Sequence, residues 1–206
     1  MNTIARKGTI LMTAISLLSG CGPSEKSRTE GQSSNKTDTS EFENIPARIG
    51  SAGGLRWEIP GDWAIGESNQ MRAATYIIPP AGGDNEHAEC AVFYFSAGQG
   101  GAVQANIDRW ISQMEQPDGS SSAGKAKMSN TKINGLKFTF LDISGTYRLA
   151  AGPMMQLKEK KPGYRMIGAI AEGPDGPVFF KFVGPSMTVE NAYKSFMTMI
   201  NSVSTD

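Results

Sequence analysis

The stretch VFYFSAGQGGAVQANIDRW (Val92–Trp110) joins an apolar, strand-like run to an amphipathic helix through a glycine-rich turn. The helix is the most clearly signalled element of the chain, because its apolar residues recur at the spacing of one helical face. These residues are Val103, Ile107, Trp110, Ile111 and Met114. A strand, a glycine turn and a helix in this order can also hold a phosphate. The stretch is therefore either a phosphate site or a plain reversal of the chain.

The glycine-rich turn does not match the known nucleotide-binding motifs. A P-loop needs a lysine after its second glycine to reach the phosphates, whereas Gly98 is followed by QGGAV. The dinucleotide fingerprint needs a third glycine, and Val103 occupies that position. We therefore interpret Gly98, Gly100 and Gly101 as residues that let the chain reverse tightly. An anion bound by free N–H groups at the start of the helix remains the alternative.

Apolar runs and turn signals on both sides of this stretch predict the element order β-β-β-α-β-β-β-β-α. The predicted strands cover residues 55–59, 71–78, 88–95, 126–133, 136–143, 164–172 and 177–184. Asn134-Gly135 is a strong hairpin signal, and residues 145–163 suggest an irregular excursion. Hairpin-type connections dominate, so we expect a largely antiparallel sheet with two packed amphipathic helices, an α+β fold.

The second helix is expected over residues 189–203. Thr188 is in position to cap its first turn, and Glu190 suits the helix dipole there. Helical spacing predicts which of its residues face the core. These residues are Val189, Ala192, Tyr193, Phe196, Ile200 and Val203.

The N-terminus has the features of a secretory signal. Arg6 and Lys7 precede an apolar run, and the run ends in LSGC at Cys21. These four residues resemble the lipobox of bacterial lipoproteins. The resemblance implies that residues 1–20 are a signal peptide and that the Cys21 thiol is diacylated. The lipid would then hold the protein on a membrane of the cell envelope, outside the cytoplasm.

Residues 22–40 contain neither an aromatic nor an aliphatic side chain. Such a segment cannot bury enough apolar area to offset the entropy of ordering it. We therefore interpret residues 21–41 as the lipidated cysteine and a disordered tether, and residues 42–206 as a single α+β domain. Gly22 follows the cysteine in place of an acidic residue; by the lipoprotein resemblance this favours the outer membrane where the envelope has two membranes.

The element order and the opening WEIPGDW (57–63) are similar to the PsbP-like superfold, which includes PsbP and the DcrB envelope lipoproteins. The resemblance implies a small accessory or binding protein, secreted or lipid-anchored. It carries over no functional residue, because no catalytic motif is matched.

Few chemistries fit the composition. Lysine plus arginine and aspartate plus glutamate number 20 each, so nothing points to nucleic acid. His87 is the only histidine, and alternation along a strand sends His87 and Cys90 to opposite faces. We therefore expect neither a metal site nor a cofactor nor a catalytic cysteine. Met154-Met155 leave a soft-metal role open. The cluster Lys158, Lys160 and Lys161 is read as a solvated loop, with contact to a polyanion or to anionic lipid as the alternative.

Three classes of function remain. The first is a non-catalytic accessory or interaction module of the envelope, bound to another envelope protein. The second is a small-ligand binder, for which Arg72, Gln99, Tyr147 and Arg148 are the candidate ligand-binding residues because they are polar side chains set among apolar ones. The third and weakest is a hydrolase, which would show a perturbed acid or base in a cleft.

Overall fold

A long antiparallel sheet forms the centre of the folded region. The computed structural model describes residues 47–69, 72–96, 98–151 and 156–206. Its elements in chain order are β1 (Arg48–Ala52), β2 (Leu55–Ile59), β3 (Ala64–Ile65), β4 (Ala74–Ile78), β5 (Ala88–Tyr94), α1 (Val103–Ser112), β6 (Met114–Glu115), a 3-10 turn (Ser122–Gly124), β7 (Lys127–Ile133), β8 (Leu136–Ala151), β9 (Gln156–Gly173), β10 (Gly176–Pro185), α2 (Ser186–Asn201) and β11 (Ser204–Thr205). The predicted signal peptide, Cys21, the tether and Met154-Met155 lie outside the described residues.

The main sheet has the strand order β3-β4-β5-β10-β9-β8-β6, and β7 pairs with β8. A small second sheet has the order β1-β2-β11. The pairings between these strands are antiparallel. With two helices packed on it, the sheet confirms the predicted α+β class. No helix in the described ranges is both long and apolar enough to cross a membrane.

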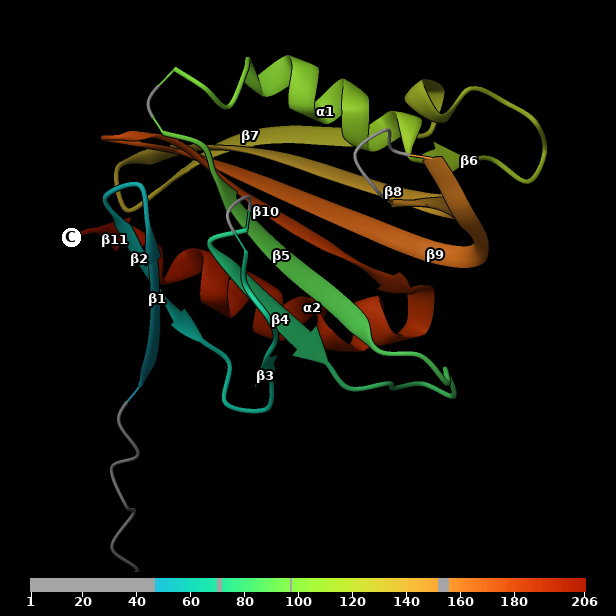
Figure 1. Ribbon diagram of the computed structural model, residues 1–206, viewed down its shortest axis with the longest axis horizontal. Coiled ribbons are helices and arrows are strands. Elements are labelled where there is room, and N and C mark those ends of the chain that lie inside the picture. Colours follow the sequence, from blue (N-terminus) through green and yellow to red (C-terminus); the bar gives the residue numbers. More distant parts are fainter. Residues whose placement is uncertain (1–46, 70–71, 97, 152–155) are drawn as a thin grey trace, which may run out of the picture. The chain divides into compact units, whose positions relative to one another are not determined.

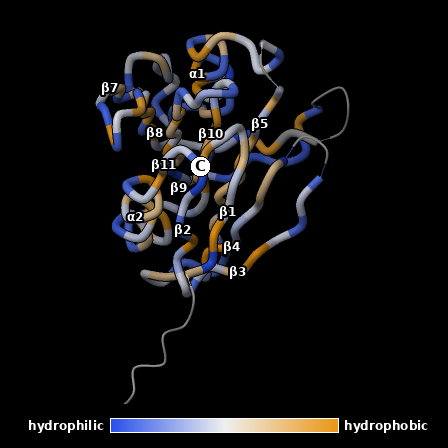
Figure 2. The backbone as a smooth tube through the Cα atoms, turned by 90° about the vertical axis from the view of Figure 1, so that its left-hand side faces the viewer, coloured by the Kyte–Doolittle hydropathy of each residue, from blue (hydrophilic) through white to orange (hydrophobic). Residues whose placement is uncertain are grey.

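Side-chain alternation along the strands gives the main sheet two different faces. In β10, Phe180 and Phe182 pack in the core that contains α2, whereas Phe179 packs in the core that contains α1. Figures 1 and 2 show the two helices on opposite sides of the strands. Lys181 lies between Phe180 and Phe182 in the sequence, so alternation sends it to the α1 face.

The α1 face is closed by the predicted helical stripe. Trp110 crosses Gly168 of β9 so closely that a Cβ atom on this glycine would lie 2.3 Å from the indole ring. Trp110 also meets Phe179 edge-on, with 6.3 Å between the ring centroids. The glycine is therefore required by packing, because any larger residue would push the helix away from the sheet.

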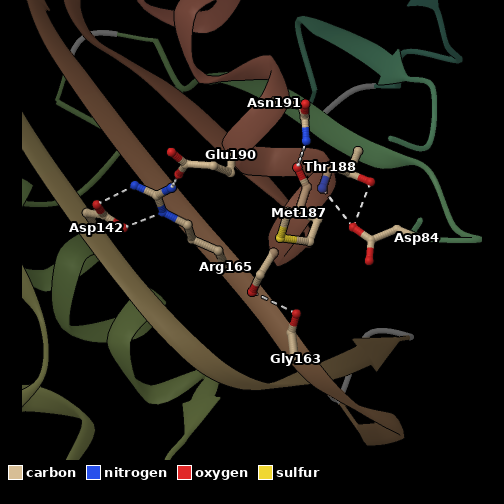
Figure 3. A network of polar contacts seen from close by, with 9 residues as sticks. Asp84, Asp142, Gly163, Arg165, Met187, Thr188, Glu190 and Asn191 are labelled. Carbon is tan, nitrogen blue, oxygen red and sulfur yellow. Dashed lines mark hydrogen bonds and ion pairs between the residues drawn. The ribbon is translucent and has the colours of Figure 1, made fainter. Parts of the chain in front are cut away.

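Helix α2 begins earlier than predicted, and Thr188 does not cap it. Pro185 occupies the N-cap position without a side-chain hydrogen bond. The cap comes instead from the β4–β5 loop, where the Asp84 carboxylate accepts hydrogen bonds from the Thr188 backbone N–H at 2.7 Å and its hydroxyl at 2.9 Å (Figure 3). A carboxylate at this helix end is favoured by the helix dipole. Tyr193, predicted on the buried side, is 41% exposed.

The predicted irregular excursion at 145–163 is wrong, because most of it belongs to the long hairpin of β8 and β9. The hairpin register shifts between Gly145 and Tyr147, and β6 pairs with Thr146 and Tyr147 at this point. A Cβ atom on Gly145 would lie 2.5 Å from the Glu115 carbonyl oxygen. β6 can therefore lie this close to β8 only because residue 145 has no side chain. Tyr147 packs against the core that contains α1, as Leu141 and Ile143 of the same strand do.

The lysines of this hairpin lie in β9 rather than in a solvated loop. Lys160 pairs with Glu115 at 2.7 Å, and Lys161 pairs with Glu86. Both charges are thus used to tie the hairpin to neighbouring elements, which argues against the alternative of a cluster free to bind a polyanion.

Candidate functional site

Lys181 is a cationic side chain buried on the α1 face, with 8% of its surface exposed. Its ammonium donates to the Gln113 side-chain carbonyl at 2.5 Å and to the Tyr147 hydroxyl at 3.1 Å. It also lies 5.0 Å from the centroid of the Tyr147 ring. Because burial removes water from the ammonium, the pKa of Lys181 falls from 10.5 to about 7.

An ion pair lies next to this lysine. Arg72 contacts Glu89 of β5 at 2.8 Å, and its guanidinium lies 5.7 Å from the centroid of the Phe93 ring. Glu89 and Arg72 both act on the charge of Lys181, the first raising its pKa and the second lowering it. Burial, followed by Glu89, raises the pKa of Tyr147. We call the group formed by Arg72, Glu89, Gln113, Tyr147 and Lys181 the Lys181 cluster.

A second set of polar contacts, next to Tyr147, ties the β8–β9 hairpin to Glu86. The rings of Tyr147 and Tyr164 are stacked with 6.0 Å between their centroids. The Tyr164 hydroxyl donates to Glu86 at 2.8 Å, and Lys161 binds the same carboxylate oxygen. Burial and this bond raise the pKa of Tyr164 to about 12. The hydrogen bonds from Lys161 and Tyr164 lower the pKa of Glu86.

Of the four candidate ligand-binding residues, the structure brings two together. Arg72 and Tyr147 both belong to the Lys181 cluster. Gln99 lies in the glycine turn, where its backbone N–H donates to Ser96 at 2.9 Å. Arg148 is the neighbour of Tyr147 in a strand and pairs with Glu115 at 3.2 Å instead. Arg72 and Tyr147 thus lie in one cluster, whereas Arg148 binds Glu115; a ligand-binding role for the four residues stays a prediction.

Sequence reasoning missed Lys181, Glu89 and Gln113. The signal for Lys181 was present, because it is one charge inside the apolar run PVFFKFVG (177–184). A lysine in a buried strand has to be paired or neutral, and both cases mark a special environment.

The other predicted motifs lie apart from the cluster. Cys90 is completely buried, and burial raises the pKa of its thiol, which makes it unreactive. Gly98 and Gly101 have φ values of 79° and 72°, as a tight reversal requires. Within the described ranges, no group of three or more histidine, cysteine, aspartate or glutamate side chains could hold a metal ion.

A groove runs along the opposite face of the sheet, between α2 and the strands β7 and β8. Two adjoining hollows of about 350 and 510 Å³ form it, and both are lined by Lys127 and Asp142. Arg165 donates to Asp142 at 2.8 and 2.9 Å and also to Glu190 of α2, which fixes the floor of the groove (Figure 3). We call this the α2 groove.

The upper part of the α2 groove is largely apolar. Its lining includes Met128 and Phe140 from the strands and Tyr193 and Met197 from α2. Met128 is 45% exposed, and the Tyr193 ring lies 5.6 Å from the Arg165 guanidinium carbon. Neither hollow of this groove is lined by a member of the Lys181 cluster.

Comparison with known proteins identifies no family. No protein-family model and no curated protein matches the chain. Among solved structures, a cyanobacterial PsbP from Synechocystis is similar over 80% of this chain and 96% of its own length, with 11% identity and a TM-score of 0.47. A protein of unknown function from Pseudomonas aeruginosa is similar over 76% of this chain and 94% of its own length, with 12% identity and a TM-score of 0.43. A structure from Bacteroides thetaiotaomicron is similar over 76% of this chain and 47% of its own length, with 15% identity and a TM-score of 0.39. These likenesses concern the fold alone.

Proposed function

We propose that the protein is a non-catalytic accessory protein of the cell envelope, anchored by lipid on Cys21, whose folded domain binds another envelope protein. The sequence supports the anchor through the apolar run ending in LSGC. The observation that carries the binding role is the α2 groove, because it combines apolar side chains, an Arg165–Tyr193 contact and an open strand edge. Aromatic and arginine side chains are the usual anchors of protein interfaces.

The open edge belongs to β7. Among the described residues this strand pairs only with β8, over Lys127–Ile133, and nearly all its residues are exposed. An extended segment of a partner can add to such an edge through backbone hydrogen bonds. Its alternate side chains would then enter the groove between β7 and α2, where Phe140 and Tyr193 provide apolar contacts.

The charges of the edge indicate which segment would fit. β7 contains Lys127 and Lys132 and no acidic residue. In the part of the chain that the structure describes, neither lysine forms a salt bridge. Lys132 also lies opposite Lys137 of β8, which places like charges side by side. The partner segment is therefore acidic, with apolar residues at alternate positions.

Site-specific photocrosslinking in cells tests this proposal. A photoreactive phenylalanine derivative replaces Tyr193 in the full-length protein, and the control carries it at Gln104, which is exposed on α1 on the opposite face. We expect one partner to be captured from position 193 only, with the crosslink mapped to an acidic extended segment. Lys127→Glu should lower the yield at least about tenfold through charge repulsion.

Two results would count against the proposal. Equal capture from positions 193 and 104 would mean that the groove is not the contact surface. An unchanged yield in Lys127→Glu would remove the acidic partner. Replacing Cys21 with serine tests the anchor separately, because it should release the protein from the membrane fraction without changing the groove.

A further inference from the structure

The Lys181 cluster has an unusual position in the sheet. Lys181 of β10 lies between Ala91 of β5 and Gly168 of β9 in the cross-strand pairing. These are the two smallest side chains, so the lysine has space along the sheet surface where a larger neighbour would exclude it. The space above Gly168 is filled by Trp110. The space above Ala91 lies toward Arg72 and Glu89, on the side of the sheet where β4 and β5 pair.

Hydrogen-bond donors outnumber acceptors in this cluster. An ammonium has three N–H donors, and the two partners of Lys181 are the uncharged Gln113 and Tyr147. No carboxylate in the described chain forms a salt bridge with Lys181. The hydroxyl of Thr75, which faces the same side as Ala91, is buried and has no hydrogen-bond partner.

Positive charges also outnumber negative charges around Lys181. Two cations, Arg72 and Arg109, lower the pKa of Lys181, and one carboxylate, Glu89, raises it. Glu89 already binds one guanidinium nitrogen of Arg72. A buried cation without a charged partner is costly unless it neutralises or an anion accompanies it. One additional anionic group would therefore complete this cluster.

We infer that the Lys181 cluster is a binding site for the carboxylate of a small molecule, held by Lys181 and by the guanidinium N–H groups of Arg72 that do not bind Glu89. A carboxylate has two oxygens in one plane and matches the fork of an arginine. The Phe93 ring, which lies against Arg72, offers an apolar surface to the body of the ligand.

Carboxylate binding at this site would be coupled to protonation. Without ligand, burial lowers the pKa of Lys181 to about 7; a bound carboxylate would raise it again, so binding above pH 7 would take up a proton. Affinity should therefore fall as the pH rises from 7 to 9. The charged and titratable groups that face the lysine from the surrounding elements are Arg72, Glu89, Arg109 and Tyr147, with Tyr164, Glu86 and Lys161 behind Tyr147.

The test is calorimetric titration of the full-length protein in detergent with acetate, benzoate and inorganic phosphate, at pH 6.5 and pH 9. We expect saturable binding of acetate or benzoate at pH 6.5 that is at least about tenfold weaker at pH 9. Arg72→Gln should weaken binding at pH 6.5 by at least about tenfold, since it removes the charged fork. Lys132→Met, an exposed lysine on β7, is the matched control and should bind as the original protein does.

Other results would overturn the inference. Binding of phosphate without either carboxylate would make the ligand class wrong. No binding of any probe at pH 6.5, equal affinity at both pH values, or unaltered binding in Arg72→Gln would each remove the site. Because Arg72 is partly exposed and Lys181 is retained in that variant, its fold can be checked by circular dichroism before the titration.

Discussion

Replacing Lys181 with methionine should change the pH dependence of stability in a predictable direction. Methionine is similar in length and carries no charge, so it can occupy the same space between Ala91 and Gly168. The pKa of Lys181 is 10.5 when exposed and about 7 in the folded protein. Each unit corresponds to about 1.4 kcal/mol, so holding the proton in the folded state costs about 5 kcal/mol.

The sign follows from proton binding. Below pH 7 both states hold the proton, and the full cost is present. Between pH 7 and 10.5 the folded protein loses the proton while the unfolded chain keeps it, so the free energy of unfolding rises with pH. Above that range the cost is gone. Between pH 7 and pH 10, Lys181 alone should raise the free energy of unfolding by about 3–4 kcal/mol.

Urea denaturation at pH 7, 8, 9 and 10 measures this effect as a difference between proteins. The free energy of unfolding of the original protein should rise by about 3–4 kcal/mol relative to Lys181→Met across this range. Loss of the bonds to Gln113 and Tyr147 shifts the variant by about 1 kcal/mol each, but equally at every pH. Lys132→Met should follow the original protein. Parallel curves for Lys181→Met and the original protein would show that Lys181 is not a buried cation without a charged partner.

Three further experiments test the packing. Gly168→Ala should destabilise the protein by about 1–3 kcal/mol or more because of the contact with Trp110, whereas Gly61→Ala, with open space around its Cβ position, should change the midpoint in urea little. Asp84→Ala removes the cap of α2 and should cost about 1–2 kcal/mol in the same assay, and an unchanged midpoint would show that the cap contributes nothing. Cys90 should react with a thiol reagent only after unfolding, because its thiol is buried and its pKa is raised; fast reaction in native buffer would contradict the burial.

The fold could be predicted from local patterns where those patterns were strong. The stripe of α1 and the apolar runs of β5, β9 and β10 predicted these elements, and the hairpin-type connections predicted a largely antiparallel sheet. The strands β3, β6 and β11 could not be predicted, because two residues carry too little periodicity, and β1 was also missed. The polar end of the β8–β9 hairpin was missed for another reason. Its lysine-rich composition resembles that of a loop.

The candidate site could be predicted only in part, for a related reason. Arg72 and Tyr147 meet the criterion of polar residues set among apolar ones in the sequence. This criterion identifies polar side chains at the edge of a hydrophobic core. Arg148 satisfied the same criterion but lies next to Tyr147 in a strand, so it points the other way. With residues 145–163 taken as irregular, this alternation could not be applied. Lys181 was overlooked because a run of apolar residues was assigned to the core as a whole.

The two proposed binding surfaces are separate because of strand geometry. Lys181 and Phe182 are adjacent in β10, yet they belong to opposite faces, and the same holds for Arg165 and Met166 in β9. The α1 face has a buried charge that an anion could compensate, whereas Arg165 at the floor of the α2 groove is already paired with two carboxylates. A small carboxylate should therefore prefer the α1 face, and a polypeptide that supplies backbone hydrogen bonds and apolar side chains should prefer the edge of β7. The protein could hold both at once, since neither surface shares a side chain with the other.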